Sequence, residues 1–170
     1  MHITRSKSKN FFSAKRIAVC GILTAAALVL GFIEKLIPLD VVFVGFKLGF
    51  SNIVVLFALY KLNLFDAFSV CVLKIFACGL AFGGPIYLLY SLSGGLLSFI
   101  VMLISKKRLN IITVSILGAV FFNIGQIICA CFVLSTKAIL YYLPFLMLAG
   151  VITGALIGCV SNIAIKRIKI

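Results

Sequence analysis

Acidic side chains are scarce in this chain, which has three of them in 170 residues against 16 lysines and arginines. They are Glu34, Asp40 and Asp66, and no two of them are neighbours. Carboxylates hold most catalytic Mg²⁺ and Ca²⁺ ions and carry much of general acid–base catalysis. The composition therefore argues against an enzyme, and it predicts no cofactor.

Motifs for metal binding and for ATP hydrolysis are also missing. The single histidine, His2, lies in the N-terminal tail, and no CxxC pair occurs among the six cysteines. A His/Cys metal site is therefore not predicted. The chain has no GxxxxGK[ST] phosphate-binding loop either, so an ATP-driven step would need a separate protein.

Hydrophobic residues, by contrast, make up 64% of the chain, and charged residues only 11%. A soluble domain has about 45–50% and about 25%, so this chain could not cover a water-facing surface. After a basic N-terminal tail, residues 1–16, an apolar run continues from Ile17 past any plausible site of signal-peptide cleavage. We therefore expect a single transmembrane domain, residues 17–170, that begins with an uncleaved helix.

Six apolar runs have lengths that suit membrane-spanning helices of about 20 residues. They cover about residues 17–37, 46–62, 67–82, 86–104, 111–134 and 140–165. Pro38 ends the first run, and residues 83–85 (GGP) separate the third run from the fourth, which is typical of helix breaks. The sequence thus predicts an all-α integral membrane protein, a bundle of six transmembrane helices.

The formal net charge of +13 is concentrated between these apolar runs. With six spans, the basic tail, Lys61, residues 106–108 and the basic C-terminus all fall on one side of the membrane. Cytoplasmic segments are rich in lysine and arginine, so we expect both termini in the cytoplasm and the chain in the cell membrane. The same distribution argues against nucleic acid as a partner.

Small residues recur four positions apart on the first run, in the pairs Gly21 with Ala25 and Ala27 with Gly31. Such ridges let two helices approach each other closely in lipid. One interpretation is packing within the bundle, as for a similar ridge at residues 150–158. The other is that the ridge on the first run docks a separate membrane subunit.

Polar side chains within the apolar runs are costly in a membrane and commonly functional. The candidates are Lys47, Asn52, Lys74, Tyr90, Asn123 and Gln126. At 1.5 Å per residue, Lys74 falls near the middle of the bilayer and the others fall in its outer half. We expect them to line one outward-open pocket for a small molecule. No carboxylate is among them, so the ligand would supply the negative charge.

These residues could also have structural roles. Lys47 could extend to the lipid headgroups, Tyr90 could be an interface aromatic, and the two amides could join helices. Lys74 could pair with Asp66, although eight residues, about 12 Å along a helix, separate them. Glu34 is expected at the membrane edge, in contact with water.

Several strings in the chain resemble the signature of a known family. They are residues 45–54 (GFKLGFSNIV), 82–84 (FGG), 90–98 (YSLSGGLLS), 123–126 (NIGQ) and 141–144 (YYLP). They resemble the bacterial Gx transporter family, often labelled heptaprenyl diphosphate synthase component I. That family is similar to the substrate-binding S components of energy-coupling-factor (ECF) vitamin transporters. Phe122 stands where the family usually has histidine, and Lys74 stands where it often has arginine, which keeps the charge but loses the bidentate fork.

The resemblance implies a six-helix, S-component-like subunit that takes up a small anionic or amphiphilic solute, such as a vitamin, flavin, quinone or isoprenoid precursor. Its partners would be an ECF coupling subunit and ATPases. The alternative is a non-catalytic membrane subunit of isoprenoid or quinone biosynthesis, or of a redox-chain assembly. Synthesis of a prenyl diphosphate itself needs aspartate-rich clusters for Mg²⁺, which this chain lacks.

Overall fold

The computed structural model describes residues 14–36, 49–82, 84–135 and 138–168, and these residues are helices and short turns without a strand. In chain order the elements are α1 (Ala14–Leu36), α3 (Asn52–Lys61), α4 (Leu64–Phe82), α5 (Gly84–Ser105), α6 (Ile111–Leu134), the short 3₁₀ helix η1 (Ala138–Tyr142) and α7 (Leu143–Arg167). Five segments, α1, α4, α5, α6 and η1 with α7, are long and apolar enough to cross a membrane. The expectation of an all-α membrane protein is confirmed at this level.

Helix boundaries follow the breaks that the sequence contains. α1 begins at Ala14, three residues before the expected Ile17, and ends at Leu36, two residues before Pro38. α5 begins at Gly84, whose φ of +72° suits glycine, and Pro85 follows in the first turn. Proline is tolerated there because the first amide hydrogens of a helix have no partner within the helix.

The second predicted span is shorter than expected in the part that the structure describes. Residues 46–48 lie outside the described residues, Gly49 to Ser51 form a turn, and α3 itself has ten residues. Ten residues extend about 15 Å, which is about half of a 30 Å hydrocarbon core. The count of six spans therefore stays a prediction.

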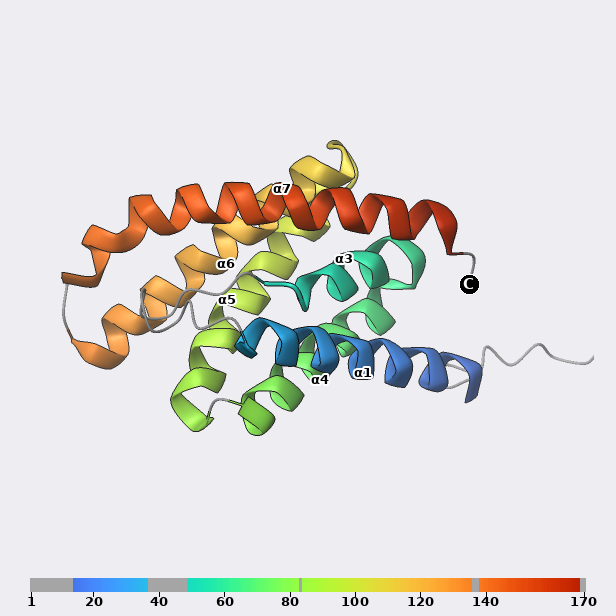
Figure 1. Cartoon of the computed structure of the whole chain (residues 1–170), viewed down its shortest axis with the longest axis horizontal. Helices are drawn as coiled ribbons and strands as arrows, with labels where there is room; N and C mark the ends of the chain where they lie inside the picture. The colour runs from blue at the N-terminus through green and yellow to red at the C-terminus, as the bar shows by residue number, and fades with distance from the viewer. Residues whose placement is uncertain (1–13, 37–48, 83, 136–137, 169–170) are drawn as a thin grey trace, which may run out of the picture.

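α3 is enclosed by the rest of the bundle. Six consecutive residues, from Val54 to Leu59, are buried, whereas α1 has one buried residue, Ala27. α3 contacts α1, α4 and α7, and Figure 1 shows it lying between α7 and α1. The turn that begins α3 lies beside the last turn of α1, where Glu34 contacts it.

Basic residues gather at one end of the bundle. Arg16 at the start of α1 pairs with Asp66 at the start of α4, with 2.7 Å between Arg16 Nη2 and Asp66 Oδ2. Lys106 near the end of α5 donates a hydrogen bond from Nζ to the Leu59 carbonyl oxygen at 2.8 Å. Figure 1 shows the start of α1, the end of α3 and the end of α7 at this same end. Its assignment to the cytoplasm stays a prediction.

The two pairs of small residues on α1 have different surroundings. Gly21 and Ala25 are exposed on the outside of the bundle. Ala27 is fully buried, and a Cβ added to Gly31 would lie 3.1 Å from Cys78 Sγ of α4. The second pair thus packs within the bundle, and docking of another subunit on the first pair stays a prediction.

Helices α5, α6 and α7 pack at very short distances through glycine. A Cβ on Gly94 would lie 2.6 Å from the Phe122 carbonyl oxygen, and a Cβ on Gly154 would lie 2.7 Å from Ile116 Cα. Both distances are to backbone atoms, which cannot rotate away. Small residues that let backbones meet are typical of helix packing in lipid.

We expect Gly154→Leu to lower the melting temperature of the detergent-solubilised protein by several degrees. Overpacking of this kind costs about 1–3 kcal/mol, and each kcal/mol is worth about 2–4 °C in a protein of this size. Gly21→Leu is the matched control, because no atom lies within 4 Å of the added Cβ. Equal melting temperatures for the two variants would contradict the close packing of α6 against α7.

Candidate functional site

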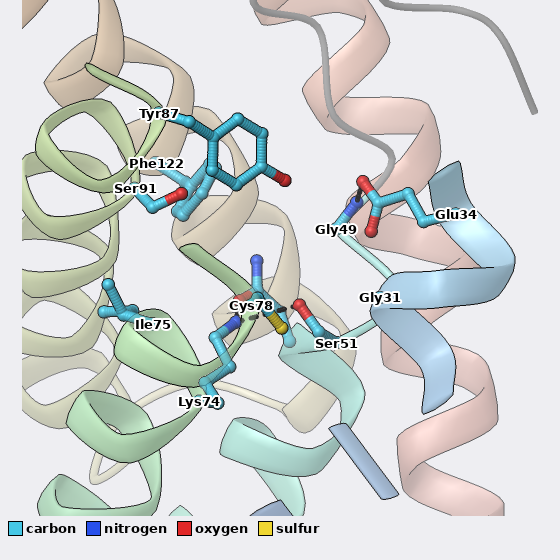
Figure 2. A pocket seen from close by; sticks show the side chains of 11 residues that line it. Gly31, Glu34, Gly49, Ser51, Lys74, Ile75, Cys78, Tyr87, Ser91 and Phe122 are labelled. Atoms are coloured by element: carbon cyan, nitrogen blue, oxygen red, sulfur yellow. Dashed lines mark hydrogen bonds between the residues drawn. The ribbon is translucent and has the colours of Figure 1, made fainter. Parts of the chain in front are cut away.

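A cavity lies where the end of α1, the start of α3, the middle of α4 and the first half of α5 meet (Figure 2). Its polar lining consists of the side chains of Glu34, Ser51, Asn52, Lys74, Tyr87 and Ser91. The space open to water is about 30 Å³, enough for one or two water molecules. Pockets for drug-sized ligands hold about 300–1,000 Å³, so the cavity is closed to such a ligand in this conformation.

Lys74 is the charged centre of the cavity. Its side chain is 5% exposed, and its Nζ donates hydrogen bonds to Ser51 Oγ at 3.1 Å and to Asn52 Oδ1. Both partners are neutral. Within the described residues no carboxylate forms an ion pair with Lys74, and Asp66 is paired with Arg16. No carboxylate in this part of the chain is hydrogen-bonded to this buried ammonium, although Glu34 lines the same cavity, and buried charged groups commonly mark functional sites in membrane proteins.

The start of α3 adds a second positive field to the same cavity. Asn52 is the first residue of α3, and the N-terminal end of a helix carries a partial positive charge from its aligned peptide dipoles. Figure 2 shows the Lys74 side chain directed at this end of α3, next to Ser51. An ammonium group and a helix N-terminus that converge on one space favour an anion there.

Glu34 holds the turn that precedes α3. Its Oε1 accepts a hydrogen bond from the Gly49 amide at 2.8 Å, and its Oε2 accepts one from the Phe50 amide at 3.1 Å. Gly49 has a φ of +78°, a conformation that glycine adopts without strain. The carboxylate thus connects α1 to the turn before α3 and satisfies two backbone amides of that turn.

The six residues predicted to form one pocket lie in several places. Asn52 and Lys74 are in contact and both line the cavity. Tyr90 is half-buried and does not line it. Lys47 lies outside the described residues.

The two amides of α6 face neighbouring helices. Asn123 is buried and donates from Nδ2 to the Leu146 carbonyl oxygen of α7 at 2.8 Å. Gln126 is buried against α5, where a Cβ on Gly94 would lie 2.9 Å from its Cγ. Neither lines the cavity. Asn123 therefore joins two helices through a hydrogen bond, a structural role that its polarity within an apolar run also allows.

Asp66 and Glu34 both have partners that differ from the ones suggested by the sequence. Asp66 accepts hydrogen bonds from Nε and Nη2 of Arg16 at 3.0 and 2.7 Å, so its partner is Arg16 and not Lys74. Glu34, expected in water at the membrane edge, bonds to backbone amides inside the protein instead. Among the described residues, no three His, Cys, Asp or Glu side chains are grouped so that they could hold a metal ion.

Sequence reasoning missed Glu34, Ser51, Tyr87 and Ser91 as cavity residues. Glu34 carried a signal, because it is one of only three carboxylates in a membrane chain. Tyr87 and Ser91 lie four residues apart on α5, which places them on one helix face. Spacing alone could not indicate that this face of α5 is turned toward α3.

Comparison with known proteins places most of the chain within one family model. The model described as heptaprenyl diphosphate synthase component I matches residues 23–164, which include most of α1 and all of α3 to α6. Neither the curated proteins nor the solved structures contain a match to the chain.

We expect Glu34→Gln to accelerate amide hydrogen exchange in the turn formed by Gly49, Phe50 and Ser51. Glutamine keeps one acceptor oxygen and turns an NH₂ group toward the second amide, which leaves that amide unsatisfied at a cost of about 1–3 kcal/mol. Exchange followed by mass spectrometry on peptides from this region measures the effect. Asp66→Asn is the control, because Asp66 contacts Arg16 at the start of α4 and does not line the cavity. Unchanged exchange in Glu34→Gln would contradict the role of this carboxylate.

Proposed function

The chain belongs to the heptaprenyl diphosphate synthase component I family, and we propose that it is a multi-pass membrane subunit that binds an anionic solute for transport. The solute is small or amphiphilic, and its acidic group occupies the cavity beside Lys74. The chain has no phosphate-binding loop for ATP, so a separate ATP-driven module would power uptake. An ECF-type coupling subunit with its ATPases is the module that the sequence signatures favour.

The proposal rests on Lys74, which is buried and whose hydrogen-bond partners, Ser51 and Asn52, are both neutral. Transfer of an ammonium group from water to a protein interior costs several kcal/mol unless an opposite charge offsets this penalty. Hydrogen bonds to Ser51 and Asn52 offset part of that cost. The partial positive charge at the N-terminus of α3 destabilises the ammonium. A ligand carboxylate or phosphate would supply the missing counter-charge, and that gain would contribute to affinity.

The position of the cavity in the bundle supports capture from outside the cell. α3 runs from the cavity to the end where Arg16, Lys61 and Lys106 gather, so the cavity lies in the opposite half of the protein. If the basic end faces the cytoplasm, as the positive-inside rule predicts, the cavity lies in the outer half of the membrane. Both termini are then cytoplasmic.

The cavity must widen before it can take a solute. α1 is the long helix whose displacement would disrupt the least buried packing. α1 contributes Gly31 and Glu34 to the lining, yet only Ala27 of this helix is buried. α5, α6 and α7 are held together by backbone contacts at glycine, so they resist displacement. Movement of α1 away from α4, together with the turn that Glu34 holds, would open the cavity at a small cost in packing.

A second function is favoured by the name of the family. The chain would then be the non-catalytic membrane component of a prenyl diphosphate synthase or of a related isoprenoid or quinone assembly, partnered by a separate catalytic chain. Lys74 would bind the diphosphate of an amphiphilic isoprenoid. This function predicts stable co-purification with a prenyltransferase, whereas the transport function predicts co-purification with ATPase and coupling subunits.

Binding to purified protein tests the leading proposal. The probes are a panel of vitamins, flavins, quinone precursors and prenyl phosphates, read by native mass spectrometry and by calorimetry. We expect Lys74→Met to weaken binding of the retained anionic ligand by about 30-fold or more, since loss of one partner of a buried charge pair costs about 2–5 kcal/mol. Asn52→Ala should have a smaller effect, about 1 kcal/mol, because it removes one hydrogen bond.

Lys107→Gln is the matched control, because it removes one positive charge from an exposed position after α5 and should leave affinity unchanged. Lys74→Met should not lower the melting temperature by much, because replacement of an unpaired buried charge by a similar apolar group is often neutral or stabilising. Wild-type affinity in Lys74→Met, or unchanged cellular uptake of the bound solute in this variant, would end the proposal.

A further inference from the structure

A second cavity opens at the basic end of the bundle, between the start of α1 and the turn that joins α3 to α4. It has a volume of about 270 Å³, and three cationic side chains line it: Lys15, Arg16 and Lys61. One carboxylate, Asp66, lines it as well. The bundle separates this space from the Lys74 cavity, and the proposed transport function makes no use of it.

Asp66 and Arg16 neutralise each other and fix one wall of the cavity. Both Arg16 Nε and Arg16 Nη2 donate to Asp66 Oδ2, at 3.0 and 2.7 Å. Arg16 is part-exposed in this pair, and its Nη1 amino group donates no hydrogen bond within the described residues. The guanidinium is therefore held in one orientation while part of its donor fork stays available to a ligand.

Once Arg16 and Asp66 are paired, two positive charges remain in the cavity, those of Lys15 and Lys61. Lys15 and Lys61 form no ion pair with any acidic side chain of the described residues. Glu34, the other acidic residue that the structure describes, is engaged with Gly49 and Phe50 at the far end of α1. With three cations and one carboxylate, the cavity is suited to an anion of more than one negative oxygen, such as a phosphate group.

Apolar side chains around the cavity indicate that the anion belongs to an amphiphile. Val19 and Leu62 line the cavity itself. Ile17 on α1 and Leu64 and Phe65 on α4 are exposed on the outer surface next to the lining residues. A ligand with its phosphate among the cations could lay hydrocarbon chains on these side chains, as basic cavities between membrane helices do with anionic lipids.

We propose that this cavity binds the phosphate headgroup of an anionic membrane lipid. Lys15 and Lys61 supply the two unpaired charges, the exposed edge of Arg16 supplies directed hydrogen bonds, and the exposed apolar residues contact the acyl chains. A lipid in this position would brace α1, the least buried of the long helices, against the turn between α3 and α4. This site is independent of Lys74, so either proposal can fail without the other.

Native mass spectrometry of the delipidated full chain, titrated with phosphatidylglycerol or with the zwitterionic phosphatidylcholine, tests the proposal. We expect tighter binding of phosphatidylglycerol in the wild type, and about tenfold weaker binding in the double variant Lys15→Gln with Lys61→Gln. Each basic group near a membrane surface adds to the attraction of anionic lipid, so removal of two such groups accounts for this factor. The Arg16–Asp66 pair remains in this variant, which preserves the fold of the turn.

The double variant Lys107→Gln with Arg108→Gln is the control, because it removes the same charge from exposed positions that do not line the cavity. Retention of phosphatidylglycerol in the control and its loss in the cavity variant would support the site. Equal weakening in both variants would overturn it, because general surface charge would then explain the binding. Displacement of the lipid by millimolar inorganic phosphate, which lacks acyl chains, would also overturn it and would assign the cavity to a soluble phosphate compound.

Discussion

Two backbone amides, those of Gly49 and Phe50, set the condition on which the rest of the cavity depends. The turn that precedes α3 lies inside a membrane protein, where no bulk water satisfies its backbone amides, and each unsatisfied group costs several kcal/mol. Glu34 meets this need from α1 with both of its carboxylate oxygens. Once the turn is fixed, the side chains of Ser51 and Asn52 are presented to Lys74. The position of the buried ammonium thus depends on a carboxylate that it does not contact.

The protein divides into a tightly packed part and a loosely packed part. α5, α6 and α7 approach so closely that a single added carbon would collide with a neighbouring backbone at Gly94, Gly125 or Gly154. α1 shares much less surface with its neighbours, and Gly21 has no atom near the place of a Cβ. The cavity lies between the two parts, with α5 on one side and α1 on the other (Figure 2). A site at such a boundary can open without repacking the core.

Much of this architecture could be predicted from the sequence because lipid imposes a simple rule on helix length and composition. Long apolar runs with breaks at Pro38 and at residues 83–85 predict the long helices to within a few residues. The polarity of Asn52 and Lys74 at membrane depth predicts that they lie in one pocket, and they are in contact. The short length of α3 does not follow, because the run from residue 46 to residue 62 is almost long enough to span.

The contacts of the other polar residues could not be predicted from their spacing in the sequence. Asn123 and Gln126 lie three residues apart, which predicts a shared face, but a helix in the middle of a bundle has neighbours on either side of that face. Asn123 reaches α7 and Gln126 reaches α5 as a result. The role of Glu34 required its pairing with a turn 15 residues away. Such pairings come from tertiary packing, which the spacing of residues in one sequence does not reveal.

The scarcity of carboxylates explains why both cavities point to an anionic ligand. Of the two acidic residues that the structure describes, Glu34 is engaged by backbone amides and Asp66 is engaged by Arg16. Neither forms an ion pair with Lys74 in the middle of the bundle or with Lys15 and Lys61 at its end. Lys74 is buried, so water cannot compensate its charge as it does at a protein surface. Lys74 therefore gains most from an anion that the described part of the chain does not itself provide, whereas Lys15 and Lys61 attract an anion through charges that no acidic side chain pairs.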